Sequence, residues 1–320
     1  MIVSKTPFRI SFIGGGTDYC DLSKETPGHV ISTTINKYMY IFLNKKFDNN
    51  FRISYSLTEN CKNLNQIKHK LIRETLKYFN ISKGIEIATI ADIPSSGSGL
   101  GSSSSLVVGL INSICKLKNK SVTPEFLAKT ASHIEIDICN KPIGMQDQYS
   151  ASYGGLNEYK FFYNKKVETS NINISKKRLN EFKNKLLLFY TGVNRQTDKI
   201  LDYRNLKVKI QTNKILKELV INFKYELIKG NLNNLGSILN ESWVLKKKTS
   251  KKISNLYFDS VYSLAIKSGA LGGKLLGAGG GGFFLFYADT ALHDNIIKKL
   301  YMLRPINFDF IDRGSEALNI

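Results

Sequence analysis

The sequence predicts a globular protein of two domains, each of which combines β-strands with α-helices. Three observations lead to this expectation: a length of 320 residues with 42% hydrophobic residues, a change from strand-like to helical spacing of apolar residues near Ser103, and a polar segment in mid-chain. That segment, Tyr163 to Asn180, indicates the boundary. We therefore expect one domain over residues 1–165 and another over 166–320.

Strands are expected at the start of the first domain. Ile2 to Ile13 is rich in apolar and β-branched residues, and similar segments follow at Val30 to Leu43 and Gly84 to Ile93. An irregular polar region separates the second segment from the third. The later part of that region, about Gln66 to Phe79, is expected to form a helix.

Two helices are expected to pack on these strands. The first begins near Ser103, and its apolar stripe is formed by Leu106, Leu110, Ile114 and Leu117. The second begins after Thr123, whose side chain can cap the helix, with Pro124 at the first helical position. Apolar residues continue at helical spacing as far as Ile138.

The second domain is expected to alternate strands with helices, and no internal repeat is evident. In chain order we expect a strand, a long helical tract, a helix, two strands, a further helix and a last strand. No bounds are assigned to the further helix. The other six elements are, in the same order, Lys185–Tyr190, Gln196 to about Ser250, Asn255–Ser268, Gly272–Leu276, Phe283–Tyr287 and Ile306–Ile311.

Composition excludes several classes of protein. The longest apolar stretch, Leu106 to Cys115, is far shorter than the roughly 20 residues of a membrane-spanning helix. The first ten residues lack the pattern of a signal peptide, so we expect a cytoplasmic protein with no membrane partner. Disulfides and structural zinc are not expected, because the cysteines are far apart in sequence: Cys20, Cys61, Cys115 and Cys139.

The formal net charge of +20 is compatible with a nucleic-acid surface or with a field that attracts anionic ligands. Most lysines are scattered, with short runs such as Lys246–Lys248, and none of the runs alternates with aromatic residues as a base-stacking surface would. A solvated lysine-rich surface explains this pattern. We therefore expect no nucleic-acid partner, and the sequence leaves homo-oligomer formation open.

The segment Pro94 to Ser105, P-S-S-G-S-G-L-G-S-S-S-S, lies between an expected strand and an expected helix. Glycines let the backbone approach phosphate oxygens, and a helix start offers unpaired N–H groups. The alternative, a flexible Gly/Ser linker, does not normally lead straight into an amphipathic helix. The segment therefore predicts a phosphate-binding loop, although it lacks the lysine of a Walker-type loop.

Two further segments are also marked by glycines. Pro7 to Tyr19 places a basic residue on a strand before the turn G-G-G-T-D, which could orient sugar hydroxyls. In Lys274 to Tyr287 four consecutive glycines interrupt two apolar strands. Such a run is favoured where the backbone passes close to a ligand or to another segment, and a simple tight turn is the alternative.

An acidic pair lies between these segments. Glu135 is on the second expected helix, and Asp147 follows twelve positions later. Phosphoryl transfer needs one carboxylate to hold Mg²⁺ and another near the accepting hydroxyl. Either acid alone would be read as a surface residue, so the pair has meaning only together with the glycine segments.

Together and in this order, the three glycine segments resemble the signature motifs of the GHMP kinases. The resemblance implies that ATP and Mg²⁺ bind in a cleft between the domains, with Glu135 and Ser103 on the metal, Ser102 being the near alternative to Ser103. It implies catalytic roles for Asp147 and Arg9. Nucleotide contacts are implied for Gly97, Ser98, Gly99, Leu100, Gly101, Ser102, Ser103 and Ser104, and sugar contacts for Gly16, Thr17 and Asp18.

The fold implied by the resemblance is an α+β fold of two domains. Its N-terminal domain is like domain 2 of ribosomal protein S5, and its C-terminal domain is ferredoxin-like. Within the family, the first and third segments and the ending Phe308 to Ser315 are most similar to kinases of D-glycero-D-manno-heptose 7-phosphate. This implies phosphorylation of the anomeric hydroxyl of that sugar phosphate, in a route to GDP-heptose.

As a mechanism, we expect Asp147 to accept the hydroxyl proton, or to support its loss, while Arg9 keeps Asp147 ionised and offsets charge on the γ-phosphate. Arg195 is the expected ligand of the far phosphate of the sugar, with Lys5 and Arg313 as alternatives. Alternative functions are a kinase of another sugar such as fucose, a nucleic-acid-binding protein, and a regulator that binds sugar without turnover.

Overall fold

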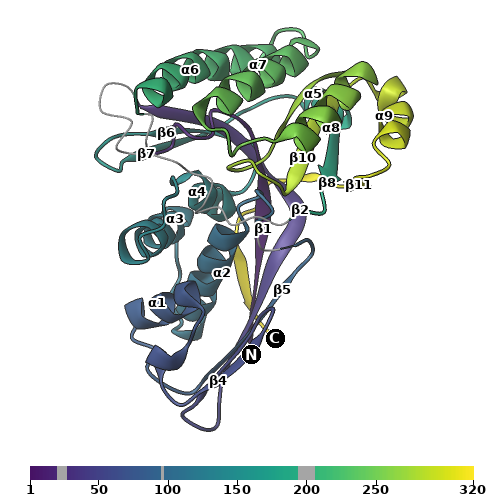
Figure 1. Cartoon of the computed structure of the whole chain (residues 1–320). Helices are drawn as coiled ribbons and strands as arrows, with labels where there is room; N and C mark the ends of the chain where they lie inside the picture. Colours follow the sequence, from purple (N-terminus) through teal and green to yellow (C-terminus); the bar gives the residue numbers. More distant parts are fainter. Residues whose placement is uncertain (20–26, 95–96, 194–205) are drawn as a thin grey trace.

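The computed structural model describes residues 1–19, 27–94, 97–193 and 206–320. Within them, nine strands form a first sheet and four form a second (Figure 1). The central strand of the first sheet, β2, pairs along its 18 residues with β1, β5, β6 and β12. The strands are β1 (Ile2–Ile13), β2 (Gly28–Lys45), β3 (Phe51–Ser54), β4 (Thr58–Cys61), β5 (Ile85–Ala91), β6 (Asn157–Phe161), β7 (Val167–Asn171), β12 (Phe310–Ile311) and β13 (Glu316–Asn319).

Helices cover one face of this sheet (Figure 1). They are α1 (Lys70–Tyr78), α2 (Ser102–Leu117), α3 (Pro124–Ser132) and α4 (Gln146–Tyr153). The expected cap of α3 is confirmed, because the Thr123 side chain accepts a hydrogen bond from the N–H of Phe126 at 3.1 Å. The helix does not continue regularly to Ile138, since residues 133–138 form a π-helical turn, η3 (His133–Ile138).

The second sheet is antiparallel throughout, in the order β11-β8-β10-β9. Its first strand in the chain lies beside the third, which is the arrangement of a ferredoxin-like βαββαβ unit. Its strands are β8 (Leu186–Tyr190), β9 (Ala270–Leu275), β10 (Phe283–Ala288) and β11 (Arg304–Pro305). The helices of this half are α5 (Lys176–Asn184), α6 (Leu206–Ile228), α7 (Asn234–Thr249), α8 (Leu256–Lys267) and α9 (His293–Lys299).

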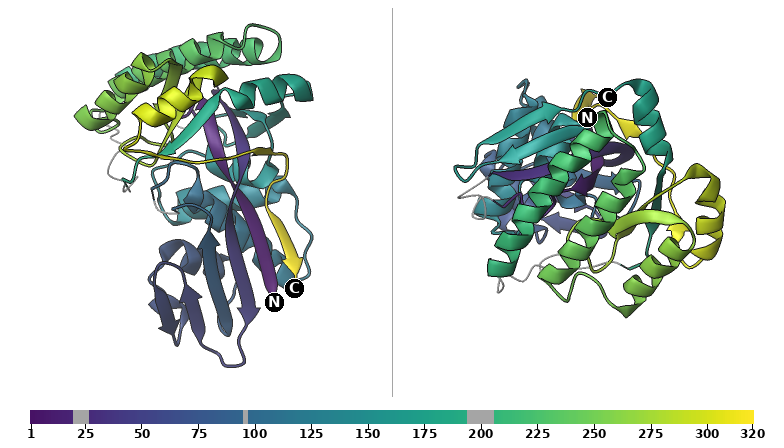
Figure 2. Two further views of the ribbon diagram at one scale, coloured as in Figure 1. Left: turned by 90° about the vertical axis from the view of Figure 1, so that its right-hand side faces the viewer. Right: turned by 90° about the horizontal axis from the view of Figure 1, so that it is seen from above.

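The two halves share one large hydrophobic core. The Phe12 ring of β1 lies 5.1 Å from the ring of Phe182 on α5, 5.9 Å from that of Phe223 on α6 and 6.0 Å from that of Phe310. The last strands return to the first sheet, so the ends of the chain lie side by side (Figure 2). The division at residue 165 stays a prediction.

Several elements differ from the expectations. Two short strands, β3 and β4, lie in the polar region before α1, and the polar mid-chain segment contains β7. The expected long helical tract is broken at 229–233, where a Cβ on Gly230 would lie 2.0 Å from a Glu226 carboxylate oxygen. The expected strand Ile306–Ile311 is reduced to its last two residues.

Cys61, Cys115 and Cys139 are buried free thiols, and Cys20 lies outside the described residues. In the described part of the chain, no helix combines the length and the apolar character that crossing a membrane requires.

Candidate active site

The segment Gly97–Gly101 leads directly into α2. Gly97, Gly99 and Gly101 have φ angles of +65°, +77° and +77°, a region that residues with a Cβ rarely adopt. The loop ends at the first turn of α2, whose N–H groups have no partner inside the helix. A cavity of about 1130 Å³ is lined by this loop and by the start of α2.

The third glycine segment packs against the loop at 97–101. A Cβ on Gly282 would lie 2.2 Å from the carbonyl oxygen of Ser98, and one on Gly281 would lie 2.7 Å from that of Val193. Backbone hydrogen bonds join Gly282 to Thr191 and to Val193. The glycines are therefore explained by close approach to another chain segment, which was one of the two expected reasons for the run.

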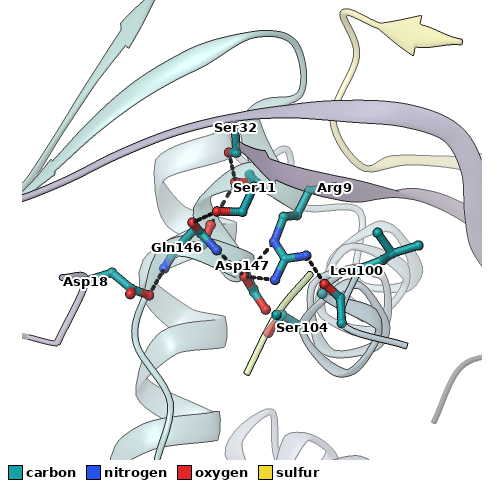
Figure 3. Close-up of polar contacts among 12 residues, drawn as sticks. Arg9, Ser11, Asp18, Ser32, Leu100, Ser104, Gln146 and Asp147 are labelled. Carbon is teal, nitrogen blue, oxygen red and sulfur yellow. Dashed lines mark hydrogen bonds and ion pairs between the residues drawn. The ribbon is translucent and has the colours of Figure 1, made fainter. Parts of the chain in front are cut away.

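Arg9 and Asp147 form the centre of the site (Figure 3). Arg9 comes from β1 and is buried, while Asp147 lies in the first turn of α4. Nε and Nη2 of Arg9 lie 2.9 and 2.8 Å from Oδ1 of Asp147, and Nη1 donates to the carbonyl of Gly99 at 2.6 Å. Gln146 also donates to Oδ1, at 2.9 Å, and is itself held by the hydroxyl of Ser11.

The two oxygens of Asp147 therefore have different surroundings. Oδ1 accepts from Arg9 and Gln146, whereas no described residue donates to Oδ2. The side chain is 28% exposed and lines the large cavity as well as a smaller one of about 160 Å³. One oxygen fixes the carboxylate and the other can receive a proton from a bound molecule.

Glu135 lies on η3 with its side chain fully buried. Ser103 donates to its Oε1 at 2.9 Å, and Ser104 and Gln148 each donate to its Oε2 at 2.6 Å. Lys141 completes the cluster, with Nζ 3.3 Å from Oε1. The structure thus brings the two expected metal ligands together, with Ser103 in the lining of the large cavity and Glu135 buried behind it.

The smaller cavity also has Asp147 in its lining and is lined by both halves of the chain. Asp18 lines it with its carboxylate held by the N–H groups of Gly16 and Gln146, at 3.0 and 3.3 Å. Burial, and then the nearby Asp147 carboxylate, raise the pKa of Asp18 above its usual range, and these N–H groups oppose the rise. Gly16 also lines this cavity, and its expected contact with a sugar stays a prediction.

Thr17 has a different environment from its neighbours. Its hydroxyl donates to the carbonyls of Gly14 and His29, at 2.8 and 3.1 Å, and accepts from the N–H of His29. Thr17 is buried and lines neither cavity. Its contacts hold the turn that presents Asp18, and the expected contact with a sugar stays a prediction.

Sequence reasoning missed three lysines near the site. Lys274 of β9 and Lys246 of α7 line the smaller cavity, and Lys141 lines the larger one. The Lys274 ammonium group donates to the carbonyl of Phe12 at 3.0 Å, and burial, together with the nearby Arg9 charge, lowers its pKa to about 7. The position of Lys274 at the start of the third glycine segment was the available signal.

The expected ligand of the far phosphate, Arg195, lies outside the described residues. Its two alternatives, Lys5 and Arg313, line a separate cavity of about 380 Å³ that has no lining residue in common with the two around Asp147. The structure therefore does not bring Lys5 or Arg313 to the site.

Comparison with known proteins defines the class of this protein. The N-terminal domain of GHMP kinases matches residues 65–155, and the C-terminal domain matches residues 223–301. The chain belongs to the GHMP kinase family and has its α+β fold, with an N-terminal and a C-terminal domain.

Among individual relatives, D-glycero-alpha-D-manno-heptose 7-phosphate kinase of Campylobacter jejuni is 33% identical over 100% of this chain and 99% of its own length. The solved structure of a candidate sugar kinase from the same species has a TM-score of 0.81 at 29% identity, covering 100% of this chain and 98% of that one. A D-glycero-D-manno-heptose 1-phosphate kinase from Bacteroides thetaiotaomicron shares the fold, with a TM-score of 0.84 at 24% identity and coverage of 100% and 99%.

Proposed function

We propose that this kinase transfers the γ-phosphoryl group of ATP to the anomeric hydroxyl of D-glycero-D-manno-heptose 7-phosphate. The products would be the 1,7-bisphosphate, a precursor of GDP-heptose, and ADP. The observation that carries the proposal is the position of Arg9 and Asp147, which line both the large cavity of the glycine loop and the smaller cavity of Asp18. The choice of sugar is supported by the full-length similarity to the Campylobacter enzyme.

The reaction follows from this arrangement. The acceptor hydroxyl, bound in the smaller cavity, loses its proton to Oδ2 of Asp147 while its oxygen bonds to the γ-phosphorus. The bond from that phosphorus to the bridging oxygen breaks, and ADP leaves with the electron pair. Arg9 holds Asp147 in position and adds positive charge where the transferred group passes. Asp18 would orient the sugar through its hydroxyl groups.

Mg²⁺ would be held through a carboxylate oxygen of Glu135 and the hydroxyl oxygen of Ser103, which are donors of the kind that it prefers. It is usually held in kinases by one or two protein oxygens together with phosphate oxygens and water. When bound, the ion neutralises charge on the nucleotide phosphates. Ser103 is suited to this role because it lies in the first turn of α2 and its hydroxyl already donates to the Glu135 carboxylate.

The test is ADP release with Mg-ATP against heptose 7-phosphate, mannose, fucose, galactose and mevalonate, with ³¹P NMR to locate the new phosphate. Selective turnover of heptose 7-phosphate to a product with an anomeric phosphate is expected. Preference for another acceptor would refute the proposed substrate and keep the kinase mechanism. A product phosphorylated elsewhere on the sugar would refute the proposed regiochemistry.

A further inference from the structure

We propose that Lys141 is a phosphate-binding lysine of the nucleotide site, and that its ammonium group takes the place of the metal between Ser103 and Glu135 until the nucleotide enters. The inference rests on the proposed function only in assuming that Mg-ATP is the phosphoryl donor. It concerns the wall of the large cavity and does not depend on the identity of the acceptor.

Glu135 is completely buried, and a buried carboxylate is costly unless a cation or several donors compensate it. Lys141 provides the cation, with Nζ 3.3 Å from Oε1 of Glu135 and 3.1 Å from the hydroxyl of Ser103. Its ammonium therefore contacts both of the oxygens that are proposed to bind the metal.

The local backbone brings Lys141 to Glu135. After η3 ends, Asn140 adopts a φ of +53°, and the N–H of Lys141 donates to the carbonyl of Glu135 at 3.0 Å. The chain thus folds back on η3, so the Lys141 side chain starts beside the carboxylate that it contacts. Asparagine is among the residues that tolerate this left-handed conformation best.

The distribution of positive charge around the large cavity also favours Lys141. The basic residues that line it within the described part of the chain are Arg9, His69 and Lys141. The Arg9 guanidinium is already bonded to Asp147 and to the Gly99 carbonyl. The glycine loop carries no lysine of its own. Lys141 is therefore the residue that can bring a mobile positive charge to the nucleotide phosphates.

The metal and the ammonium cannot both hold the same two oxygens. Mg²⁺ binds oxygen at about 2.1 Å, and a cation that close to Ser103 and Glu135 would repel the ammonium. The flexible four-carbon stem of Lys141 lets the charge move to the phosphate oxygens, while Glu135 keeps a cationic neighbour throughout. Nucleotide entry would thus exchange one cation for another at Glu135.

The decisive variant is Lys141→Met, tested by titrating Mn²⁺ into the nucleotide-free protein and following free Mn²⁺ by electron paramagnetic resonance. Removal of the competing ammonium should tighten Mn²⁺ binding about tenfold, or about 1.4 kcal/mol. In parallel, affinity for ATP in the presence of a chelator, measured by calorimetry, should fall about tenfold because one phosphate contact is lost. Lys141→Arg should keep the wild-type affinity for ATP.

Lys70→Met is the matched control. The Lys70 ammonium donates to the carbonyl of Cys139 at 2.7 Å, close to η3, but Lys70 does not line the cavity. Its removal should change neither affinity. Thermal melting identifies a folding defect, and Lys141→Gln repeats the test if Lys141→Met does not fold.

A folded, uncharged variant with wild-type affinity for both Mn²⁺ and ATP would overturn the proposal. So would tighter binding of ATP by that variant. Both measurements omit the sugar, so they distinguish a failure of this inference from a failure of the proposed acceptor.

Discussion

At Asp147, three N–H groups hold one carboxylate oxygen and leave the other to the cavity. Asp147→Asn keeps the shape of the side chain but cannot accept the proton, so kcat should fall by about 10² to 10⁴. Affinity for ATP should stay within a few-fold of wild type, as measured by calorimetry. Steady-state turnover within a few-fold of wild type would exclude the assigned role. Asp137→Asn, at an exposed pair with Lys165, is the control.

Lys274 gives a pH signature of the buried site. Its pKa of about 7 in the folded protein lies below the usual 10.5 of lysine. Between these pH values the unfolded chain holds the proton and the folded chain does not, so the contribution of Lys274 to the free energy of unfolding rises with pH, by at most about 1.4 kcal/mol per unit.

Urea unfolding of wild type and Lys274→Met at pH 7, 8 and 9 measures this contribution. The stability of wild type relative to the variant should increase at each step. A difference that stays constant with pH would show that Lys274 keeps its charge in the folded protein. Lys267→Met, an exposed substitution on α8, should show no such trend.

At the scale of elements, the start of α2 depends on Gly101. A Cβ there would lie 3.3 Å from Cγ of Arg9 and 3.5 Å from Cγ of Asp147, at a φ of +77°. Gly101→Ala should therefore cost about 1–2 kcal/mol in unfolding free energy and lower kcat more than tenfold, because Arg9, which holds Asp147, must shift.

Gly192→Ala provides the comparison for Gly101→Ala. Gly192 has a φ of +74°, and a Cβ there would meet no atom of the described residues within 4 Å. The Gly192→Ala variant should lose a similar amount of unfolding free energy in urea, and its turnover should stay at the wild-type value. Equal turnover of the two variants would mean that contacts of Gly101 do not position the catalytic pair.

The sequence predicted some elements better than others, for physical reasons. The apolar stripe from Leu106 and the Thr123 cap predicted α2 and α3 because both signals are local. In contrast, α4 is buried on nearly every side and has no amphipathic pattern to detect, although it carries Asp147. The short strands β3 and β4 contain too few apolar residues to stand out.

The site residues were also predicted unevenly, according to whether their signal was local in the sequence. Arg9, Asp18, Glu135 and Asp147 were expected from motifs. The structure places Arg9, Asp18 and Asp147 in the lining of two adjoining cavities, and it buries Glu135 behind Ser103 of the larger one. Lys141 was not expected, because its place beside Glu135 depends on the left-handed turn at Asn140 and on η3. A helix template with a regular period contains neither feature.

At the scale of the whole molecule, the shared core around Phe12 predicts that both halves unfold together. Phe12→Ala should lower the unfolding free energy by about 3–5 kcal/mol. Fluorescence of Trp243, the single tryptophan and a buried residue of the second half, should follow the same urea transition as circular dichroism.

Two separate transitions would show that the halves are independent. The exposed Phe47 offers a control, since Phe47→Ala should change stability by no more than about 0.5 kcal/mol.

The close approach of Gly282 to Ser98 also limits how this protein can be recombined with its relatives. The loop at 97–101 and the strand-linking segment at 277–282 belong to different halves of the chain, yet they fit together with no space for a side chain. A chimaera that takes its second half from another kinase must therefore supply glycine at position 282. Otherwise the new Cβ would displace the glycine loop. The chimaeric protein would then lose activity because of a contact that lies far from its crossover point.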